Sequence, residues 1–202
     1  MPDKSFTSKI TDDVLVQQGR RGDFAALEAL MLRYQDRLYN VILRICTNRD
    51  DAAELTQETF VKVIENIGKF QGKSSFYTWS FRIAVNLTLN HCRRNARIGF
   101  CSMDTEQTQV NQGAAMVLRD FISDDKSPDP VNIAQNKELC EIVSACLMKL
   151  DDMHRTIITL RDIEGMSYAQ MAKVLNVELG TVRSRLSRAR KNLREILENV
   201  LK

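Results

Sequence analysis

Residues 180–194 carry the side chains of this sequence that are best suited to bind a nucleic acid. The run contains no Asp or Glu, and Arg183 and Arg188 lie near its start. Arginine binds guanine through two hydrogen bonds, and short hydroxyl side chains donate to phosphates or bases. The predicted DNA contacts are Thr181, Arg183, Ser184, Ser187 and Arg188, with Arg185, Arg190 and Lys191 placed to neutralise phosphates. The alternative is a helical hairpin whose basic face is only solvated.

The preceding residues predict the helices that must position this run. Ser167 and Gln170 have the spacing of a capping box, which begins a helix. Ala172 is small enough for two helices to cross closely, and Asn176 with Val177 provides a turn. A second helix from about residue 178 to about 200 completes a helix-turn-helix, whose second helix enters the major groove of DNA.

A second basic segment, residues 66–103, also lacks Asp and Glu. Two amides, Asn86 and Asn90, are four residues apart, so one helix face would present both to base edges. The loop at 72–75 (GKSS) is short, polar and basic, and such a loop can hold an unstacked base with its phosphates. The predicted contacts of this segment are Lys73, Phe76, Arg82, Asn86 and Asn90. Phe76 and Trp79 also fit the apolar stripe of the same helix, where they would be core residues.

An acidic helix face precedes this segment. Asp50, Glu54, Gln57, Glu58 and Val61 fall on one side of a helix because positions i, i+4 and i+7 or i+8 align. Acids near a helix N-terminus stabilise the helix through its macrodipole, and that role by itself would explain them. The other interpretation is a docking face for a basic helix of a partner protein.

Composition excludes several classes of protein. The chain has 202 residues, 44% of them apolar, and a net charge of +3, which fits one large or two small globular domains. It contains no apolar run of the roughly 18–20 residues that span a bilayer, and its N-terminus lacks a signal-peptide pattern. Five cysteines without a C-x-x-C pair argue against disulfides and zinc, and favour a reducing, cytoplasmic location.

The sequence gives no indication of catalysis or of a cofactor. His91 and His154 are isolated, without the companions of a metal or nucleophilic site. The triplet Gly72-Lys73-Ser74 lacks the upstream spacing of a nucleotide-binding loop. We therefore expect no enzyme activity, no catalytic residue, no metal, no cofactor and no small-molecule substrate.

Apolar residues recur at three- and four-residue spacing over most of the chain, which predicts helices. The predicted helical stretches are about 24–45, 51–67, 75–87, 139–150 and 155–163. The periodicity fades between about 98 and 134, where acids, Gln, Gly and Pro are frequent, and only Met116–Phe121 suggests a helical turn. The predicted fold is all-α, with two small helical domains at 1–97 and 135–202 joined by a flexible acidic linker at 98–134.

Three stretches, in this order and spacing, resemble a known family. They are residues 51–60 (DAAELTQETF), the run from Phe76 to Asn86, and residues 180–185 (GTVRSR). The chain resembles bacterial RNA polymerase sigma factors of the extracytoplasmic-function group, of the sigma-E type, over about residues 10–97 and 135–200. One departure is Glu178, where the family often has Pro. An acid there would cap the helix dipole or repel a phosphate.

The resemblance implies a non-catalytic subunit that recognises and melts promoters. The first domain would correspond to sigma region two and bind the clamp helices of the largest polymerase subunit. The contacts implied for that surface are Asp51, Glu54, Gln57, Glu58 and Phe60. The segment that carries Asn86 and Asn90 would open the minus-ten element and capture a flipped base.

The second domain would correspond to region four, which binds the minus-35 element as duplex and contacts the polymerase flap. The acidic linker would run toward the RNA exit path. Family members are usually held inactive by an anti-sigma factor, often membrane-embedded. The resemblance therefore implies such a partner here, beside core RNA polymerase and promoter DNA, and a stress or envelope regulon.

Two other functions fit parts of the sequence. A stand-alone helix-turn-helix repressor or activator would explain residues 160–195 but would leave Asn86, Asn90 and the acidic helix without a role. The second alternative function is that of a structural RNA-binding or ribosome-associated adaptor. A sigma factor requires core polymerase for tight, specific promoter binding, whereas a stand-alone regulator does not. A sigma factor also prefers a two-box promoter over structured RNA, which an RNA-binding adaptor would not.

Overall fold

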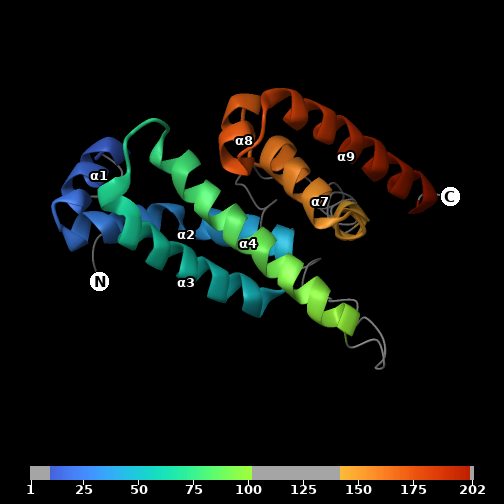
Figure 1. Ribbon diagram of the computed structural model, residues 1–202, viewed down its shortest axis with the longest axis horizontal. Coiled ribbons are helices and arrows are strands. Elements are labelled where there is room, and N and C mark those ends of the chain that lie inside the picture. Colours follow the sequence, from blue (N-terminus) through green and yellow to red (C-terminus); the bar gives the residue numbers. More distant parts are fainter. Residues whose placement is uncertain (1–9, 102–141, 201–202) are drawn as a thin grey trace, which may run out of the picture.

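The computed structural model describes residues 10–101 and 142–200, and these residues form helices without a β-strand. The first half contains α1 (Asp12–Arg20), α2 (Phe24–Cys46), α3 (Arg49–Asn66), the short 3-10 helix η1 (Ile67–Lys69) and α4 (Phe76–Cys101) (Figure 1). The second half contains a helical stretch at 142–148, α7 (Asp152–Ile158), the π-helical turn η2 (Thr159–Ile163), α8 (Tyr168–Leu175) and α9 (Leu179–Val200). The prediction of an all-α fold is confirmed. Helix α1 was not predicted.

Polar side chains before α2 and α3 begin these helices. The Asp23 carboxylate accepts hydrogen bonds from the backbone N–H groups of Ala25 and Ala26, at 3.0 and 3.3 Å. The Asn48 side chain accepts from Asp50 and Asp51, at 2.9 and 3.1 Å. Each cap satisfies N–H groups that have no partner inside the helix. Between α2 and α3 only two residues turn the chain, so the two helices pack antiparallel.

An aromatic group closes the end of the first half where α1, α2 and η1 meet. Phe70 and Phe76 are buried, and Trp79 packs on both, with ring centroids 5.0 Å from Phe70 and 5.9 Å from Phe76. Tilted aromatic pairs at such distances are favourable beyond their buried area. The interpretation of Phe76 as a core residue is confirmed.

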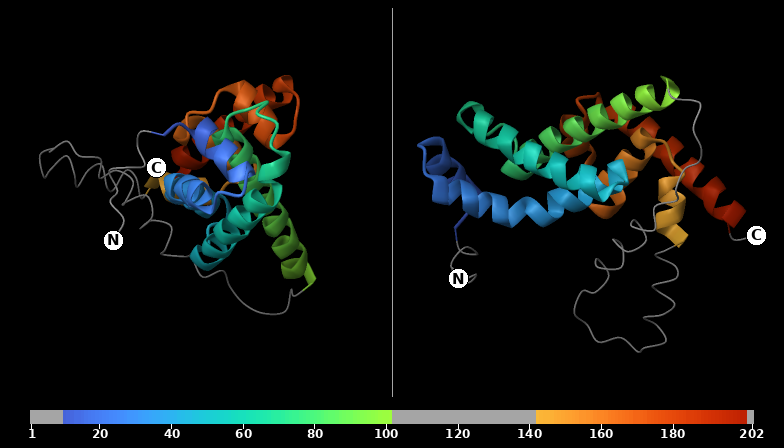
Figure 2. Two further views of the ribbon diagram at one scale, coloured as in Figure 1. Left: turned by 90° about the vertical axis from the view of Figure 1, so that its left-hand side faces the viewer. Right: turned by 90° about the horizontal axis from the view of Figure 1, so that it is seen from below.

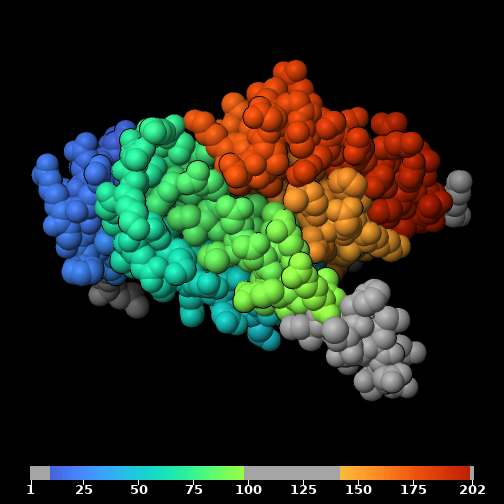
Figure 3. All heavy atoms as spheres, viewed as in Figure 1, coloured from blue at the N-terminus to red at the C-terminus, as the bar shows by residue number. Residues whose placement is uncertain are grey.

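The two halves of the chain pack directly against each other. One cluster of buried apolar residues draws on both halves: Leu38, Ile42 and Phe81 come from the first, and Ile157, Leu160 and Met166 from the second. Helix α8 lies on α4, and α7 lies against α2 (Figures 1 and 2). In the space-filling view the second half lies directly beside α4 (Figure 3). The sequence predicted two small domains with modest cores but not this shared core.

Most of the predicted linker, with its helical turn at Met116–Phe121, lies outside the described residues. The proposed boundaries at 97/98 and 134/135 therefore stay predictions. Within the described ranges, no helix is long and apolar enough to cross a bilayer.

Candidate nucleic-acid interface

The helix-turn-helix forms as its sequence predicts. The Ser167 hydroxyl accepts from the backbone N–H of Gln170 at 3.2 Å, and the Gln170 side chain accepts from the backbone N–H of Ser167 at 2.8 Å. This reciprocal pair is the expected capping box. At the other end of α8, Asn176 has a left-handed backbone (φ 52°), and Val177 donates to the carbonyl of Ala172 at 3.1 Å. The turn therefore ends α8 at once and starts α9 at a fixed angle.

Helix α9 presents its predicted DNA contacts outward. Val182, Leu186 and Ala189 are buried, so the apolar side of α9 faces α7 and α8. Exposed on the rest of the helix are Arg183, Ser184, Ser187 and Arg188, while Thr181 is half-buried near its start. The structure therefore places all five predicted residues on the first three turns of one helix. Four of the five side chains are open to a ligand.

A shallow groove of about 370 Å³ follows this exposed side of α9. Its lining residues are Tyr168, Arg183, Leu186, Ser187, Arg190, Lys191 and Arg194. The Arg183 guanidinium lies 5.9 Å from the centroid of the Tyr168 ring, a cation–π geometry that orients the arginine without neutralising it. Arg190 pairs with Asp162, its Nε donating to Oδ2 at 3.2 Å. Of the two, Arg183 is thus the better placed to bind an anion.

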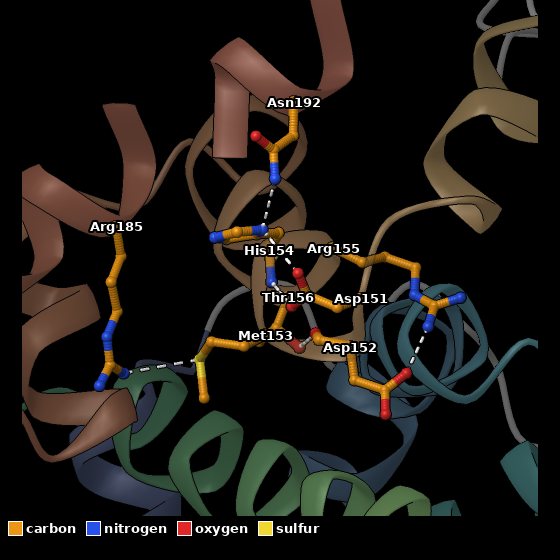
Figure 4. A network of polar contacts seen from close by, with 8 residues as sticks. All are labelled: Asp151, Asp152, Met153, His154, Arg155, Thr156, Arg185 and Asn192. Carbon is orange, nitrogen blue, oxygen red and sulfur yellow. Dashed lines mark hydrogen bonds and ion pairs between the residues drawn. The ribbon is translucent and has the colours of Figure 1, made fainter. Parts of the chain in front are cut away.

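A polar network fastens α9 to α7 (Figure 4). His154 Nδ1 lies 2.6 Å from a carboxylate oxygen of Asp151 and 3.2 Å from the Asn192 amide nitrogen. Arg185 donates to the Met153 sulfur at 3.7 Å, and Arg155 pairs with Asp152. The sequence interpretation missed these roles, although Asp151–His154 and Asp152–Arg155 have the i, i+3 spacing of helix neighbours. The network fixes the position of α9 against α7. Arg185, which was predicted to neutralise a phosphate, takes part in it.

Helix α4 carries the second set of predicted contacts. Arg82, Asn86 and Asn90 are exposed and follow one another at four-residue spacing, and Lys73 is exposed in the loop before α4. The opposite side of α4 is buried through Ala84, Val85 and other core residues, so the polar stripe has a fixed orientation. Phe76 differs, because it is only 3% exposed. Its side chain is part of the core in this structure and offers no surface to a base.

The acidic side of α3 is exposed in part. Asp50, Glu54 and Gln57 are exposed and Glu58 is half-buried. Asp51 is also half-buried, and its carboxylate lies 3.0 Å from His91 Nε2 on α4. Phe60 is 7% exposed and belongs to the shared core. In this conformation Asp51 therefore ties α3 to α4, and Phe60 packs inside the protein.

Two exposed apolar residues lie on the same side of α3 as these acids. Val61 and Ile64 are 51% and 40% exposed, and their i, i+3 spacing puts them on one side of α3. A surface with acids and exposed aliphatic side chains suits a basic, partly apolar partner better than it suits solvent.

A cleft of about 720 Å³ separates the start of α4 from the helix-turn-helix. Cationic side chains line both sides of it: Lys73 and Arg82 from the first half, and Lys173 and Arg185 from the second. Lys173 Nζ also donates to the backbone carbonyl of Lys73 at 3.0 Å. Glu178, the departure from the family pattern, is the single carboxylate among the lining residues that the structure describes. The two predicted DNA-binding surfaces therefore meet at one cleft.

Known protein families match each half of the chain separately, and known proteins match nearly its whole length. The family model described as Sigma-70 region 2 matches residues 30–98, and that described as Sigma-70, region 4 matches residues 140–193. The chain is 34% identical over 192 residues to the RNA polymerase sigma-H factor of Pseudomonas aeruginosa, covering 95% of this chain and 96% of that one. It is 35% identical over 198 residues to the ECF RNA polymerase sigma-E factor of Haemophilus influenzae, covering 96% and 97%.

Two solved structures have a fold similar to that of this chain. The structure of CnrH in complex with the cytosolic domain of CnrY superposes with a TM-score of 0.63 at 25% identity, covering 93% of this chain and 97% of that one. The sigma factor RpoE of Bartonella quintana, solved with the anti-sigma factor NepR, shares the fold with a TM-score of 0.64 at 23% identity, covering 85% and 96%.

Proposed function

The chain belongs to the extracytoplasmic-function group of RNA polymerase sigma factors, which act in promoter recognition for transcription initiation, and we propose how its surfaces divide that work. Helix α9 binds the minus-35 element as duplex. Helix α4 and the loop before it bind the minus-ten element and hold a base that has left the stack. The exposed side of α3 binds core RNA polymerase.

The observation that carries this proposal is the pair of outward-facing polar stripes on α4 and α9. Each is exposed, contains no acid and lies opposite a buried apolar side. The stripes differ in chemistry: Asn86 and Asn90 on α4 suit hydrogen bonds to base edges, whereas Arg183 and Arg188 on α9 suit guanine and phosphate in a duplex. A protein with both stripes can bind one DNA element as duplex and another whose bases have left the stack.

In vitro transcription with purified core polymerase on a promoter library tests the proposal. We expect transcripts that start downstream of a shared pair of sequence boxes, and none from core polymerase without this chain. Specific promoter binding in the absence of core polymerase would instead indicate a stand-alone regulator. No transcript from any template would refute the proposal.

Charge reversal on α3 tests the polymerase surface. Glu54→Lys combined with Glu58→Lys should weaken binding to core polymerase roughly tenfold, with a steeper loss at low salt, because complementary charges steer and hold such interfaces. Binding is measured by fluorescence anisotropy of the labelled sigma chain. Glu65→Lys is the matched control, since Glu65 is also exposed on α3 but pairs with Lys62 at 2.9 Å. Wild-type affinity of the double variant would show that the acids serve only the helix dipole.

We further propose that a regulatory protein of the anti-sigma type binds this chain and that the chain serves a stress or envelope regulon. CnrH, which shares the fold over nearly its whole length, was solved with the cytosolic domain of CnrY. Affinity capture from the source bacterium with the tagged chain should retain core polymerase and a second, regulatory protein, and the Glu54/Glu58 variant should lose the polymerase.

A further inference from the structure

One aromatic ring beside the exposed side of α9 contacts two arginines. The ring belongs to Tyr168, the first residue of α8. The Arg161 guanidinium of η2 lies 4.9 Å from the ring centroid, and the Arg183 guanidinium of α9 lies 5.9 Å from it. A guanidinium within about 6 Å of an aromatic centroid is attracted by the negative charge on the ring face. We call these three residues the Tyr168 cluster.

Two members of the cluster are fixed by the backbone around them. Arg161 Nη1 donates to the backbone carbonyl of Met166 at 2.7 Å. Met166 is 1% exposed, and its own N–H donates to the carbonyl of Leu160 at 3.0 Å, so the loop between η2 and α8 has a set shape. Ser167, the N-cap of α8, directly precedes Tyr168. The ring and Arg161 therefore have defined positions before any ligand binds.

Arg183 is the member of the cluster that faces a ligand. It is exposed near the start of α9 and lines the 370 Å³ groove together with Tyr168. In the same groove Asp162 neutralises Arg190, whereas an aromatic ring has no net charge and leaves the charge of Arg183 available. An exposed arginine loses rotamer freedom when it binds a base. A contact that restricts the side chain beforehand reduces this entropic cost.

Arg188 provides a comparison within the same helix. It is also exposed on α9. Because it follows Arg183 by five residues, it is turned by about 140° around the helix axis from Arg183. The Tyr168 ring therefore contacts one of the two arginines that we expect to bind guanine, and the other serves as an internal control.

We propose that Tyr168 is a positioning residue for recognition of the minus-35 element: its ring, with Arg161 held against it, orients Arg183 toward one base pair. The proposal rests on the function proposed above for α9. Arg183 makes the contact with the base, and Tyr168 acts through Arg183. Without the ring, Arg183 still reaches the phosphates of a bound duplex but selects the base less well. The ring therefore affects discrimination between bases more than total affinity.

Competition binding of holoenzyme to all single-base variants of the minus-35 element tests this. Arg183→Ala and Arg188→Ala first identify the base pair that each arginine reads. Tyr168→Leu removes the ring and should reduce discrimination at the Arg183 base pair roughly two- to fivefold, the size of an exposed cation–π contact. Tyr168→Phe keeps the ring and should retain wild-type discrimination. Discrimination at the Arg188 base pair should stay unchanged in both variants of Tyr168.

Combined substitutions separate positioning from support of the fold. In the Arg183→Ala chain, Tyr168→Leu should have no further effect on discrimination, because the side chain that the ring orients is gone. A ring that only supports the helix-turn-helix would instead reduce binding to all sequences in both backgrounds. Circular dichroism checks the helices of each variant, and Tyr168→Met replaces Tyr168→Leu if the latter loses helix.

NMR relaxation of the Arg183 Nε–H group in the free chain gives a second measurement, which needs neither polymerase nor DNA. This group should be more mobile in Tyr168→Leu than in the wild type or in Tyr168→Phe. The Nε–H group of Arg188 is the control, and its mobility should be the same in all three chains.

The proposal fails if discrimination at the Arg183 base pair stays at the wild-type level in Tyr168→Leu, or falls equally at the Arg188 base pair. It also fails if Arg183 is as mobile in the wild type as in Tyr168→Leu, if Tyr168→Phe loses as much discrimination as Tyr168→Leu, or if Tyr168→Leu and Tyr168→Met both lose helix. A holoenzyme without base preference in the minus-35 element, but with Arg183 ordered by the ring, would retain the cluster and reject the function proposed for α9.

Discussion

Helices α4 and α9 carry the two DNA-facing stripes, but the protein holds them differently. Helix α4 packs against α2 and α3 on one side and against α8 on another, and Phe81, Ala84 and Val85 are fully buried along it. Helix α9 packs mainly against α7 and α8. Its C-terminal end extends beyond them (Figure 1). The first helix is a fixed part of the shared core, and the second is held along one side by α7 and α8, as far along as Asn192.

This difference matches the charge that each helix carries. Helix α4 has two covered sides and keeps a narrow polar line. That line carries Arg82 and the amides Asn86 and Asn90, and Arg93, Arg94 and Arg97 are exposed further along the helix. Helix α9 is open over more of its circumference and carries Arg183, Arg188 and Lys191 there. Charged side chains need water or phosphate around them. We therefore expect Asn86 and Asn90 of α4 to contribute base selectivity with little salt dependence, and the exposed arginines of α4 and α9 to contribute salt-dependent affinity.

The largest effect should come from the part of α4 that both halves share. Phe81→Ala removes a fully buried ring and should lower the free energy of unfolding by about 3–5 kcal/mol. Because the core is continuous, urea unfolding should remain one transition by Trp79 fluorescence and by circular dichroism. Leu186→Ala in α9 is the comparison. Two separate transitions in the wild-type chain would show that the halves fold independently and that the shared core contributes little.

An intermediate effect is expected on α9. Arg183→Ala or Arg188→Ala should reduce discrimination in the minus-35 element by about 1–3 kcal/mol if the side chain makes a bidentate contact with guanine. Competition binding of holoenzyme to promoter variants measures this. Lys191→Ala is the control for a phosphate contact, which should weaken all sequences alike. Unchanged base preference in both arginine variants would remove them from the specificity-determining residues.

The smallest effect is expected on the α4 stripe. Asn86→Ala should impair recognition of the minus-ten element by about 1 kcal/mol, at the lower end for an amide–base contact, and should leave core polymerase binding intact. Open-complex formation, followed by permanganate reactivity of unpaired thymines, measures it. Asn95→Ala, further along α4, is the matched control. A loss of polymerase affinity in Asn86→Ala would mean that α4 belongs to the polymerase surface.

Local features of this site followed from local sequence. The capping box at Ser167 and Gln170, the turn at Asn176 and the outward face of α9 all depend on residues within one or two helical turns of each other. The extent of burial, which depends on distant neighbours, was harder to predict. Phe60 and Phe76 are predicted contacts of a partner, and both are buried in this structure; their roles as contacts stay predictions. Periodicity gives the apolar side of a helix, not how far neighbouring helices cover it.

The amino-acid sequence by itself determined most of the helices, the helix-turn-helix and the two acid-free stripes, because spacing, capping and charge act over a few residues. Only the tertiary structure decided that the two halves share one core, that Arg185 and His154 hold α9 to α7, and that Glu164 meets Arg37 and Tyr77. These contacts join residues more than 30 positions apart, up to 127 in the case of Arg37 and Glu164. No local pattern marks such pairs, since their energy depends on burial that exists only after the helices have packed.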